Sequence, residues 1–211
     1  GYYQESNHDR NIQVVDKFFE GAIKVVVIAK GVEDTLKLPD VQHVILYQLP
    51  FSKVVFQQQC KRANQADNPS TLHFLFGKED IQSNQLIVRD MAPERLMVGQ
   101  VYLVLKAASK LQPRIELTNE QIAKQCCSQY RIFFSENSVG TAVEILQELA
   151  LLWWETIDSK RVITLAPTPA QKLDIEQSVT FRAGSVIREE LNQVIIMVMN
   201  VPVNELVAGI G

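Results

Sequence analysis

Cysteine and histidine are scarce in this chain. Among 211 residues there are three of each. The cysteines, Cys60, Cys126 and Cys127, form no C-x-x-C pair, so the spacing typical of a zinc ribbon or a dithiol redox site is missing. An odd cysteine count without a secretory leader is typical of a reduced protein, and we therefore predict a cytoplasmic location.

Long apolar runs and an excess of positive charge are also missing. The longest apolar run, Val194–Met199, is far shorter than the roughly 20 residues that a membrane-spanning helix needs, so no membrane partner is predicted. The formal net charge of −3 excludes a uniformly basic nucleic-acid wrapper. Any contact with DNA would have to come from a local cluster of cations, and its affinity would fall with salt.

No segment has the form G-x-x-x-x-G-K-[ST], so the chain lacks the loop that cradles nucleotide phosphates. His43 and His73 fall within β-branched runs, where we expect packed or edge residues rather than metal ligands. Cys126 and Cys127 are expected to pack as small apolar groups. We predict no catalytic, cofactor-binding or metal-binding residue in this chain.

The first part of the chain alternates between helical and strand-like patterns. Alternating strands and helices favour a parallel sheet in an α/β domain, with strands covered on both faces. We place this domain at residues 1–88. The predicted elements are a helix over 11–20, strands over 23–29, 41–49 and 71–76, and a helix over 52–62.

The pattern changes after residue 88. Helices are predicted over 93–109 and 138–154, and a strand over 160–167. Between the two helices a third is predicted to begin after Thr118, where Gln121 completes a capping box. Three helices and a terminal hairpin are the plan of a winged helix, so a mostly helical, winged-helix-like domain is predicted at residues 89–184. Residues 185–211 are predicted to form two docking helices, the second starting at Pro202.

Two segments of the first domain resemble the second RecA-like domain of superfamily 2 helicases. These are LPDVQHVILYQLP (38–50) and QQCKRANQ (58–65), which lies over the arginine motif and keeps Gln58, Arg62 and Ala63. The second arginine of that motif, the one expected to reach a γ-phosphate, is replaced by Gln65. The resemblance implies a small RecA-like parallel sheet flanked by helices, degenerate and unable to hydrolyse ATP.

The later half resembles the C-terminal region of bacterial RecJ, the single-stranded-DNA-specific exonuclease. The resemblance rests on RDMAPERLMVGQVYLVL (89–105), LTNEQIAKQC (117–126) and KLDIEQSVTFR (172–182). It implies that the catalytic domains, which hold Mn²⁺ or Mg²⁺ in a D-H-H motif, lie upstream. This chain has no D-H-H triplet and opens on glycine, so we expect a fragment without a cofactor of its own.

Six cations are the candidate DNA or partner contacts: Lys61, Arg62, Arg89, Arg95, Lys160 and Arg161. The predicted third helix of the winged-helix-like domain, 138–154, has no lysine or arginine, which argues against docking in the major groove. Adjacent residues on a helix point about 100° apart, so of Trp153 and Trp154 we expect one in the core and one partly exposed.

We therefore predict a non-catalytic accessory region of a RecJ-type exonuclease of DNA repair or recombination. It would position the nuclease or bind a repair partner. The expected partners are the upstream nuclease domains, single-stranded-DNA-binding protein or a helicase, with weak contact to single-stranded DNA. Two alternatives stay open. One is the C-terminal fragment of an ATP-dependent superfamily 2 helicase, and the other is a protein-interaction module that never meets nucleic acid.

Overall fold

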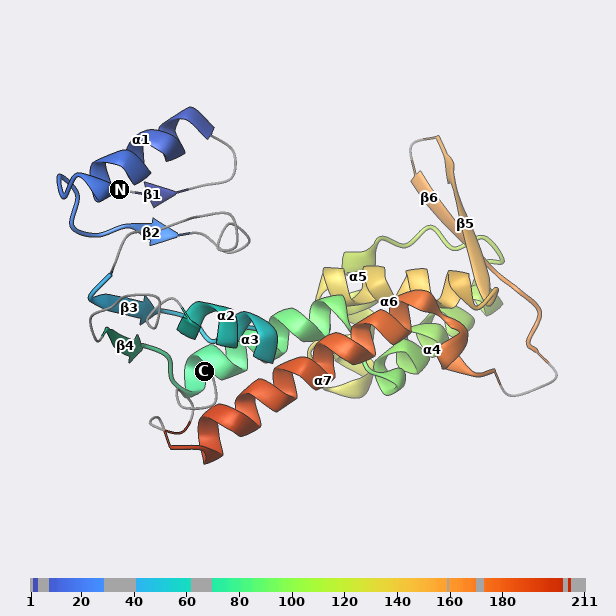
Figure 1. The fold of residues 1–211 in the computed structure, drawn as a ribbon. Helices are drawn as coiled ribbons and strands as arrows, with labels where there is room; N and C mark the ends of the chain where they lie inside the picture. The colour runs from blue at the N-terminus through green and yellow to red at the C-terminus, as the bar shows by residue number, and fades with distance from the viewer. Residues whose placement is uncertain are drawn as a thin grey trace. The chain divides into compact units, whose positions relative to one another are not determined.

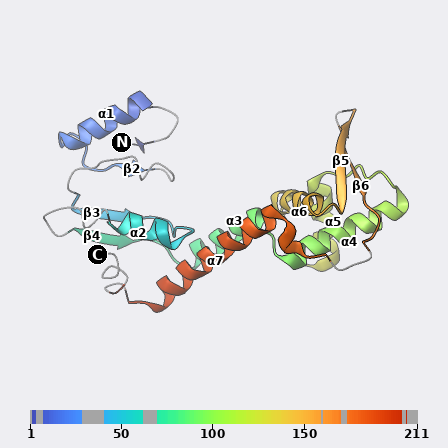
Figure 2. The same cartoon turned by 45° about the vertical axis from the view of Figure 1, so that its right-hand side comes forward.

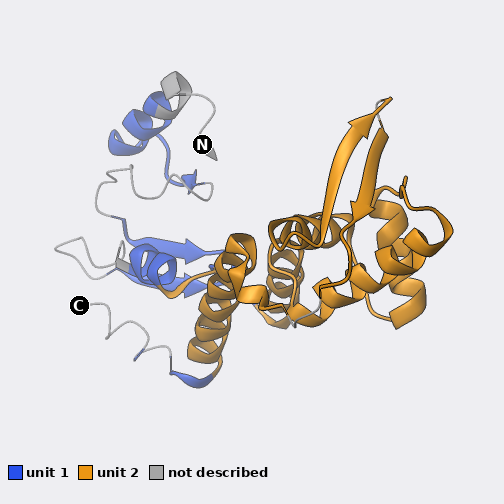
Figure 3. Cartoon of the chain, turned by 90° about the vertical axis from the view of Figure 1, so that its right-hand side faces the viewer, with its two compact units in different colours: residues 1–50, 54–76, 200–211 blue, residues 51–53, 77–199 orange. Residues whose placement is uncertain are grey.

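The computed structural model describes residues 2–3, 8–28, 41–61, 70–158, 160–169, 173–202 and 205. These residues form a mixed α/β structure with seven α-helices and three two-stranded sheets (Figure 1). The chain divides into two compact units, which Figure 3 distinguishes by colour. Unit 1 comprises residues 1–50, 54–76 and 200–211, and unit 2 comprises residues 51–53 and 77–199.

Unit 1 contains two short parallel strand pairs. One joins β1 to β2, and the other joins β3 to β4 with α2 between them in the sequence, which makes a β-α-β connection. Phe56 of α2 is fully buried and stacks on Phe74 of β4, with ring centroids 5.6 Å apart. The elements are β1 (Tyr2–Tyr3), α1 (His8–Phe19), β2 (Val27–Ile28), β3 (His43–Leu46), α2 (Lys53–Lys61) and β4 (Thr71–Phe74).

The predicted helices over 11–20 and 52–62 are confirmed within the described residues, as is the parallel pairing of the strands predicted over 41–49 and 71–76. Both strands are shorter than predicted, and the expected covering of both faces is wrong for β3, where Ile45 is 56% exposed. The strand predicted over 23–29 is wrong in its length and in its expected burial on both faces. Within the described part of this segment only Val27 and Ile28 are strand, they pair with β1 rather than β3, and Val25 and Val27 are 66% and 53% exposed. β-branched residues favour a strand, but only packing partners can bury one.

Unit 2 is mostly helical and carries an antiparallel hairpin made by β5 and β6. In Figure 2 the hairpin stands beside the helices α4, α5 and α6. Ile115, between α4 and α5, pairs with Ile163 of β6 on the outer edge of the hairpin. The elements are α3 (Lys78–Met91), α4 (Arg95–Leu111), α5 (Asn119–Tyr130), α6 (Glu136–Glu148), β5 (Leu152–Ile157), β6 (Lys160–Leu165), a 3-10 turn (Ile175–Gln177) and α7 (Val179–Asn200).

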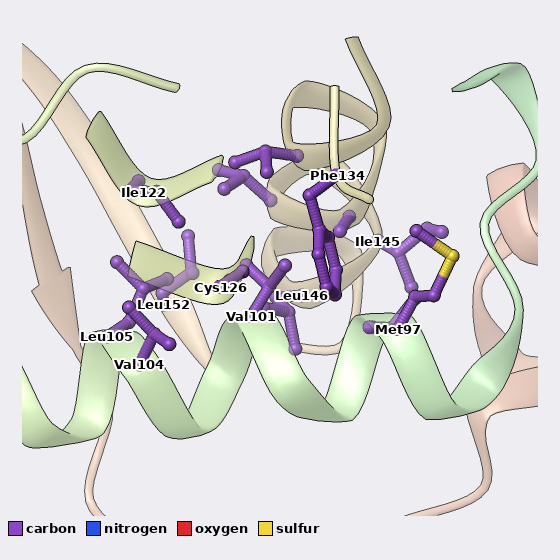
Figure 4. Packing of buried hydrophobic residues seen from close by; sticks show 14 of the residues in the cluster. Met97, Val101, Val104, Leu105, Ile122, Cys126, Phe134, Ile145, Leu146 and Leu152 are labelled. Atoms are coloured by element: carbon purple, nitrogen blue, oxygen red, sulfur yellow. The ribbon is translucent and has the colours of Figure 1, made fainter. Parts of the chain in front are cut away.

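One hydrophobic core joins α4, α5, α6 and the base of the hairpin (Figure 4). α4 contributes residues spaced three or four apart, which places them on one face of the helix. The predicted capping box of α5 is confirmed, because the N–H of Gln121 donates to Thr118 Oγ1 and the N–H of Thr118 donates to Gln121 Oε1. Core residues include Met97, Val101, Val104, Leu105, Ile122, Cys126, Phe134, Ile145, Leu146 and Leu152.

The predicted helix over 138–154 ends early, at Glu148. Ala150 has a φ of 55°, the N–H of Ala150 donates to Gln147 C=O, and the N–H of Leu151 donates to Leu146 C=O. This is the Schellman ending, in which a left-handed residue closes the helix. Trp153 and Trp154 therefore lie in β5, where they are 49% and 44% exposed, and the expectation that one is in the core is wrong.

α7 packs against the junction of α3 and α4. Leu191 shares a small core with Val88 and Ala92, and an added Cβ on Gly184 would lie 2.9 Å from the Cβ of Ala92. Arg188 donates from Nη1 to the C=O of Ala92 at 2.8 Å. α3 and α7 are each continuous through the boundaries expected after residues 88 and 184. The helix expected from Pro202 lies almost entirely outside the described residues.

Glu148, the last residue of α6, holds the start of α7. Its carboxylate accepts from Ser178 Oγ at 2.6 Å, from Thr180 Oγ1 at 2.6 Å and from the N–H of Thr180 at 3.1 Å. Partial desolvation acts to raise the pKa of Glu148, but these hydrogen bonds outweigh it and lower the pKa. Ser178 Oγ in turn accepts from the N–H of Phe181 at 3.0 Å, so Ser178 caps α7 and the Glu148 carboxylate supports that cap.

Replacing Gly184 by alanine is expected to lower the free energy of unfolding of unit 2 by about 1–3 kcal/mol, because the new methyl group must displace Ala92, including its backbone. Gly99 of α4 is the matched control. It has open space around it, so Gly99→Ala is expected to raise stability by about 0.5–1 kcal/mol. Urea unfolding followed by circular dichroism measures both, and equal effects of the two changes would contradict the close approach.

Glu148→Gln is expected to destabilise unit 2 by about 1 kcal/mol at neutral pH, with allowance for solvent screening of this exposed carboxylate. The pKa of Glu148 in the folded protein lies below its unfolded value of about 4.3. The stability that the carboxylate contributes is therefore fully present above about pH 4.3, and it is lost as pH falls through the folded-state pKa. The two proteins should therefore converge in stability at low pH. Glu144→Gln on the same helix is the control, and a pH-independent gap between wild type and Glu148→Gln would contradict the account.

Candidate functional site

Two of the six candidate contacts lie at or beyond the end of α2. Lys61 is the last residue of α2, and Arg62 lies outside the described residues, as do Ala63 and Gln65 of the arginine-motif resemblance. Gln58, the remaining matched position, is exposed on α2. The structure therefore places the helix that carries the motif but not its arginine.

Arg89 and Arg95 stand on either side of the junction between α3 and α4. The guanidinium of Arg89 is directed to a neighbouring helix, where Nε lies 3.1 Å from the sulfur of Met97. Arg95 is the first residue of α4 and is exposed. Arg89 is thus partly exposed and in contact with α4, whereas Arg95 is exposed.

Lys160 and Arg161 begin β6 and face the segment that leads into α5. Arg161 Nη2 donates to Asn119 Oδ1 at 2.6 Å and to the C=O of Leu117 at 3.4 Å, and partial burial lowers the pKa of the Arg161 guanidinium. Lys160 Nζ forms an exposed ion pair with Glu116 Oε2 at 3.4 Å. Arg161 thus ties the hairpin to the start of α5, whereas Lys160 adds only an exposed ion pair.

The charge of α6 is acidic. It carries Glu136, Glu144 and Glu148 and has no lysine or arginine. A recognition helix in the major groove needs cations near the phosphates, and α6 offers like charge instead. The electrostatics of this helix therefore oppose docking on a duplex.

The two tryptophans of β5 lie on opposite faces of the hairpin. Trp153 is opposite Thr164 and Trp154 is opposite Ile163, and successive side chains of a strand alternate between faces. They cannot form one platform on which successive bases stack. A sequence pattern of period two around them would have indicated the strand, but the apolar run that precedes them fits a helix equally well.

Among the described residues, no group of three or more histidine, cysteine, aspartate or glutamate side chains could hold a metal ion. His43 and His73 lie on the paired strands β3 and β4, with His43 Nδ1 3.1 Å from His73 Nε2. Burial raises the pKa of Cys60 to about 11. Burial, with a smaller contribution from Cys127, does the same for Cys126, so both are protonated thiols at neutral pH and poor nucleophiles.

Comparison with family models, with curated proteins and with solved structures finds no match for this chain. In the part of the chain that the structure describes, no helix has the length and apolar character needed to cross a bilayer. A function can therefore be proposed only from the geometry of the described residues and from the sequence resemblances.

Arg161→Ala is expected to lower the free energy of unfolding of unit 2 by about 1–3 kcal/mol, because it leaves Asn119 and the C=O of Leu117 without their partly buried donor. The neighbouring Lys160→Ala removes only an exposed ion pair and should cost less than about 1 kcal/mol. Urea unfolding separates the two effects. If Arg161→Ala left stability unchanged but weakened DNA binding, the cation would be a contact rather than part of the fold.

Proposed function

We propose that the chain is the C-terminal accessory region of a RecJ-type 5′-to-3′ single-stranded-DNA exonuclease, with a winged-helix-like domain in unit 2 and no active site of its own. Its role is to position the nuclease or to bind a repair partner. The upstream nuclease domains, single-stranded-DNA-binding protein or a helicase are the partners that the resemblance implies, and the cytoplasm is the compartment.

The observation that carries the proposal is the order of elements in unit 2. Helix α4 is followed by the bridged residue Ile115, then by α5, α6 and the hairpin β5–β6. Helix, short strand, helix, helix and hairpin is the order of a winged helix. Two of the segments on which the RecJ resemblance rests lie mainly in α4 and α5 of this order, and the third follows the hairpin, across the 3-10 turn and the start of α7.

A protein-directed role is favoured over DNA reading by the charges of the domain. α6 holds three glutamates without a cation, and Lys160 and Arg161 of the hairpin are engaged with Glu116 and Asn119. Arg161, which is partly buried and hydrogen-bonded, is not free to meet phosphates, and Lys160 in its exposed ion pair would add at most a single cation. Contact with single-stranded DNA is therefore weak in this proposal.

Unit 1 supports a degenerate RecA-like piece. β3, α2 and β4 form a parallel β-α-β connection, as the helicase resemblance implies. The sequence replaces the second arginine by Gln65 and has no phosphate-binding loop, so ATP hydrolysis has no residues to carry it. Mn²⁺ or Mg²⁺ would belong to the upstream catalytic domain.

The chain by itself is expected to release no nucleotides from 5′-labelled single-stranded DNA with Mn²⁺ and to hydrolyse no ATP. The protein translated from the full reading frame is the positive control, and it should degrade the same substrate. Metal-dependent cleavage by this chain that disappears when one of its residues is changed would overturn the accessory role. ATP hydrolysis that is lost with Arg62→Ala would instead favour the helicase alternative.

A further inference from the structure

A groove of about 390 Å³ lies in unit 2 between α4 and the end of β6. One wall is the face of α4 that carries Tyr102, Lys106 and Ser109. The other wall is formed by Pro113 and residues 164–168. None of these residues is among the six cations predicted from the sequence.

The strand edge that borders the groove is open. Ala166 donates its N–H to the C=O of Leu151, the residue directly before β5, whereas Ile163 exchanges both backbone hydrogen bonds with Ile115, each at 2.9 Å. Backbone groups of a strand alternate between its two edges, so the N–H and C=O of Leu165 point to the same edge as those of Ile163. The residue that would continue the pairing there is Pro113, which has no N–H to donate.

This leaves the N–H and C=O of Leu165 without a backbone partner among the described residues, on the side where the groove lies. An unpaired strand edge is a template for an added peptide strand. Pro113 ends the intramolecular pairing, and Pro167 limits an added strand to a short segment. The edge thus suits a brief strand-like contact rather than open-ended sheet growth.

The groove is positively charged. Lys106 Nζ lies 5.8 Å from the ring centroid of Tyr102, and no described carboxylate forms an ion pair with it. The groove lining contains no acidic residue. Lys110, three residues before Pro113, and Arg114, directly after it, lie outside the groove lining. A lysine without an ion-pair partner beside the N–H and C=O of Leu165 favours a carboxylate on an extended chain.

We propose that this groove binds an extended acidic segment of a partner protein. One residue of that segment pairs with the backbone of Leu165, and a carboxylate close to it in sequence meets Lys106. This inference rests on the proposed function only for the existence of a protein partner. The position of the binding site and the chemistry of its ligand are inferred from the geometry of the groove. A nucleic-acid strand would use Lys106 but has no alternating amide donors and acceptors for the strand edge.

The test begins with a library of random peptides selected on the immobilised full chain. Enriched peptides are expected to share an aspartate or glutamate within a short β-branched stretch. Fluorescence anisotropy with a labelled, enriched peptide then measures its affinity for variants. Lys106→Glu is expected to weaken binding about tenfold through loss of the charge-assisted contact. Lys110→Glu makes the same charge change on the same helix outside the groove lining, and should weaken it less than about twofold.

Ser109→Arg separates occupancy of the groove from attraction by net charge. It adds a positive charge but fills the groove, so our proposal expects about tenfold weaker binding, whereas charge attraction alone expects tighter binding. Circular dichroism confirms that each variant is folded. The proposal is overturned if enriched peptides show no acidic preference, or if Lys106→Glu and Lys110→Glu act equally.

Two further results would assign the groove to another occupant and so reject the proposal. One is displacement of the peptide by oligo-dT at matching concentration, which would make it a nucleic-acid site. The other is a dimer of the chain in sedimentation that Ser109→Arg abolishes, which would make a second copy the occupant. Neither outcome bears on the nuclease assignment, which the cleavage assay tests separately.

Discussion

The pairing of Ile163 with Ile115 sets the arrangement of unit 2. Ile163 is fully buried in the core shared by α4, α5 and α6, and both of its backbone groups bond to Ile115. Because a strand repeats every two residues, this one fixed position decides what its neighbours face. Arg161, two residues earlier, reaches Asn119 at the start of α5, and the backbone groups of Leu165, two residues later, belong to the same strand edge as those of Ile163.

A second set of contacts binds α7 to the rest of unit 2, at the start of the helix and near its middle. Glu148 of α6 supports the cap of α7, and Arg188 bonds to the C=O of Ala92 where α3 ends. The absence of a side chain at Gly184 lets α7 approach Ala92 closely between these two points. The polar groups that the helix ends would leave unpaired are thus satisfied by neighbouring helices.

Local signals in the sequence predicted much of this fold. The capping box of Thr118 and Gln121, the apolar face of α4 and the strands β3 and β4 depend on residues close together in the chain, and all are present. The end of α6 could not be predicted in the same way. A left-handed residue there would usually be glycine, but the chain uses Ala150, so nothing marked the stop before Trp153.

The candidate site was less predictable because it depends on contacts between residues far apart in the sequence. Lysine and arginine can be found in a sequence, but their partners depend on the fold. Arg161 bonds to Asn119, 42 residues away, and Lys160 pairs with Glu116, 44 residues away. The groove beside Leu165 depends on which way the backbone of β6 faces, which composition does not encode. These contacts join residues far apart in the sequence, so the spacing of the cations does not reveal them.

The central claim is that the cations of this chain serve its fold and a protein partner, and do not hold nucleic acid firmly. Fluorescence anisotropy of labelled oligo-dT with the chain, at low and at high salt, tests it most directly. The account predicts weak binding at low salt that disappears at high salt, because only a few exposed charges meet the phosphates. Tight binding that survives high salt would contradict it.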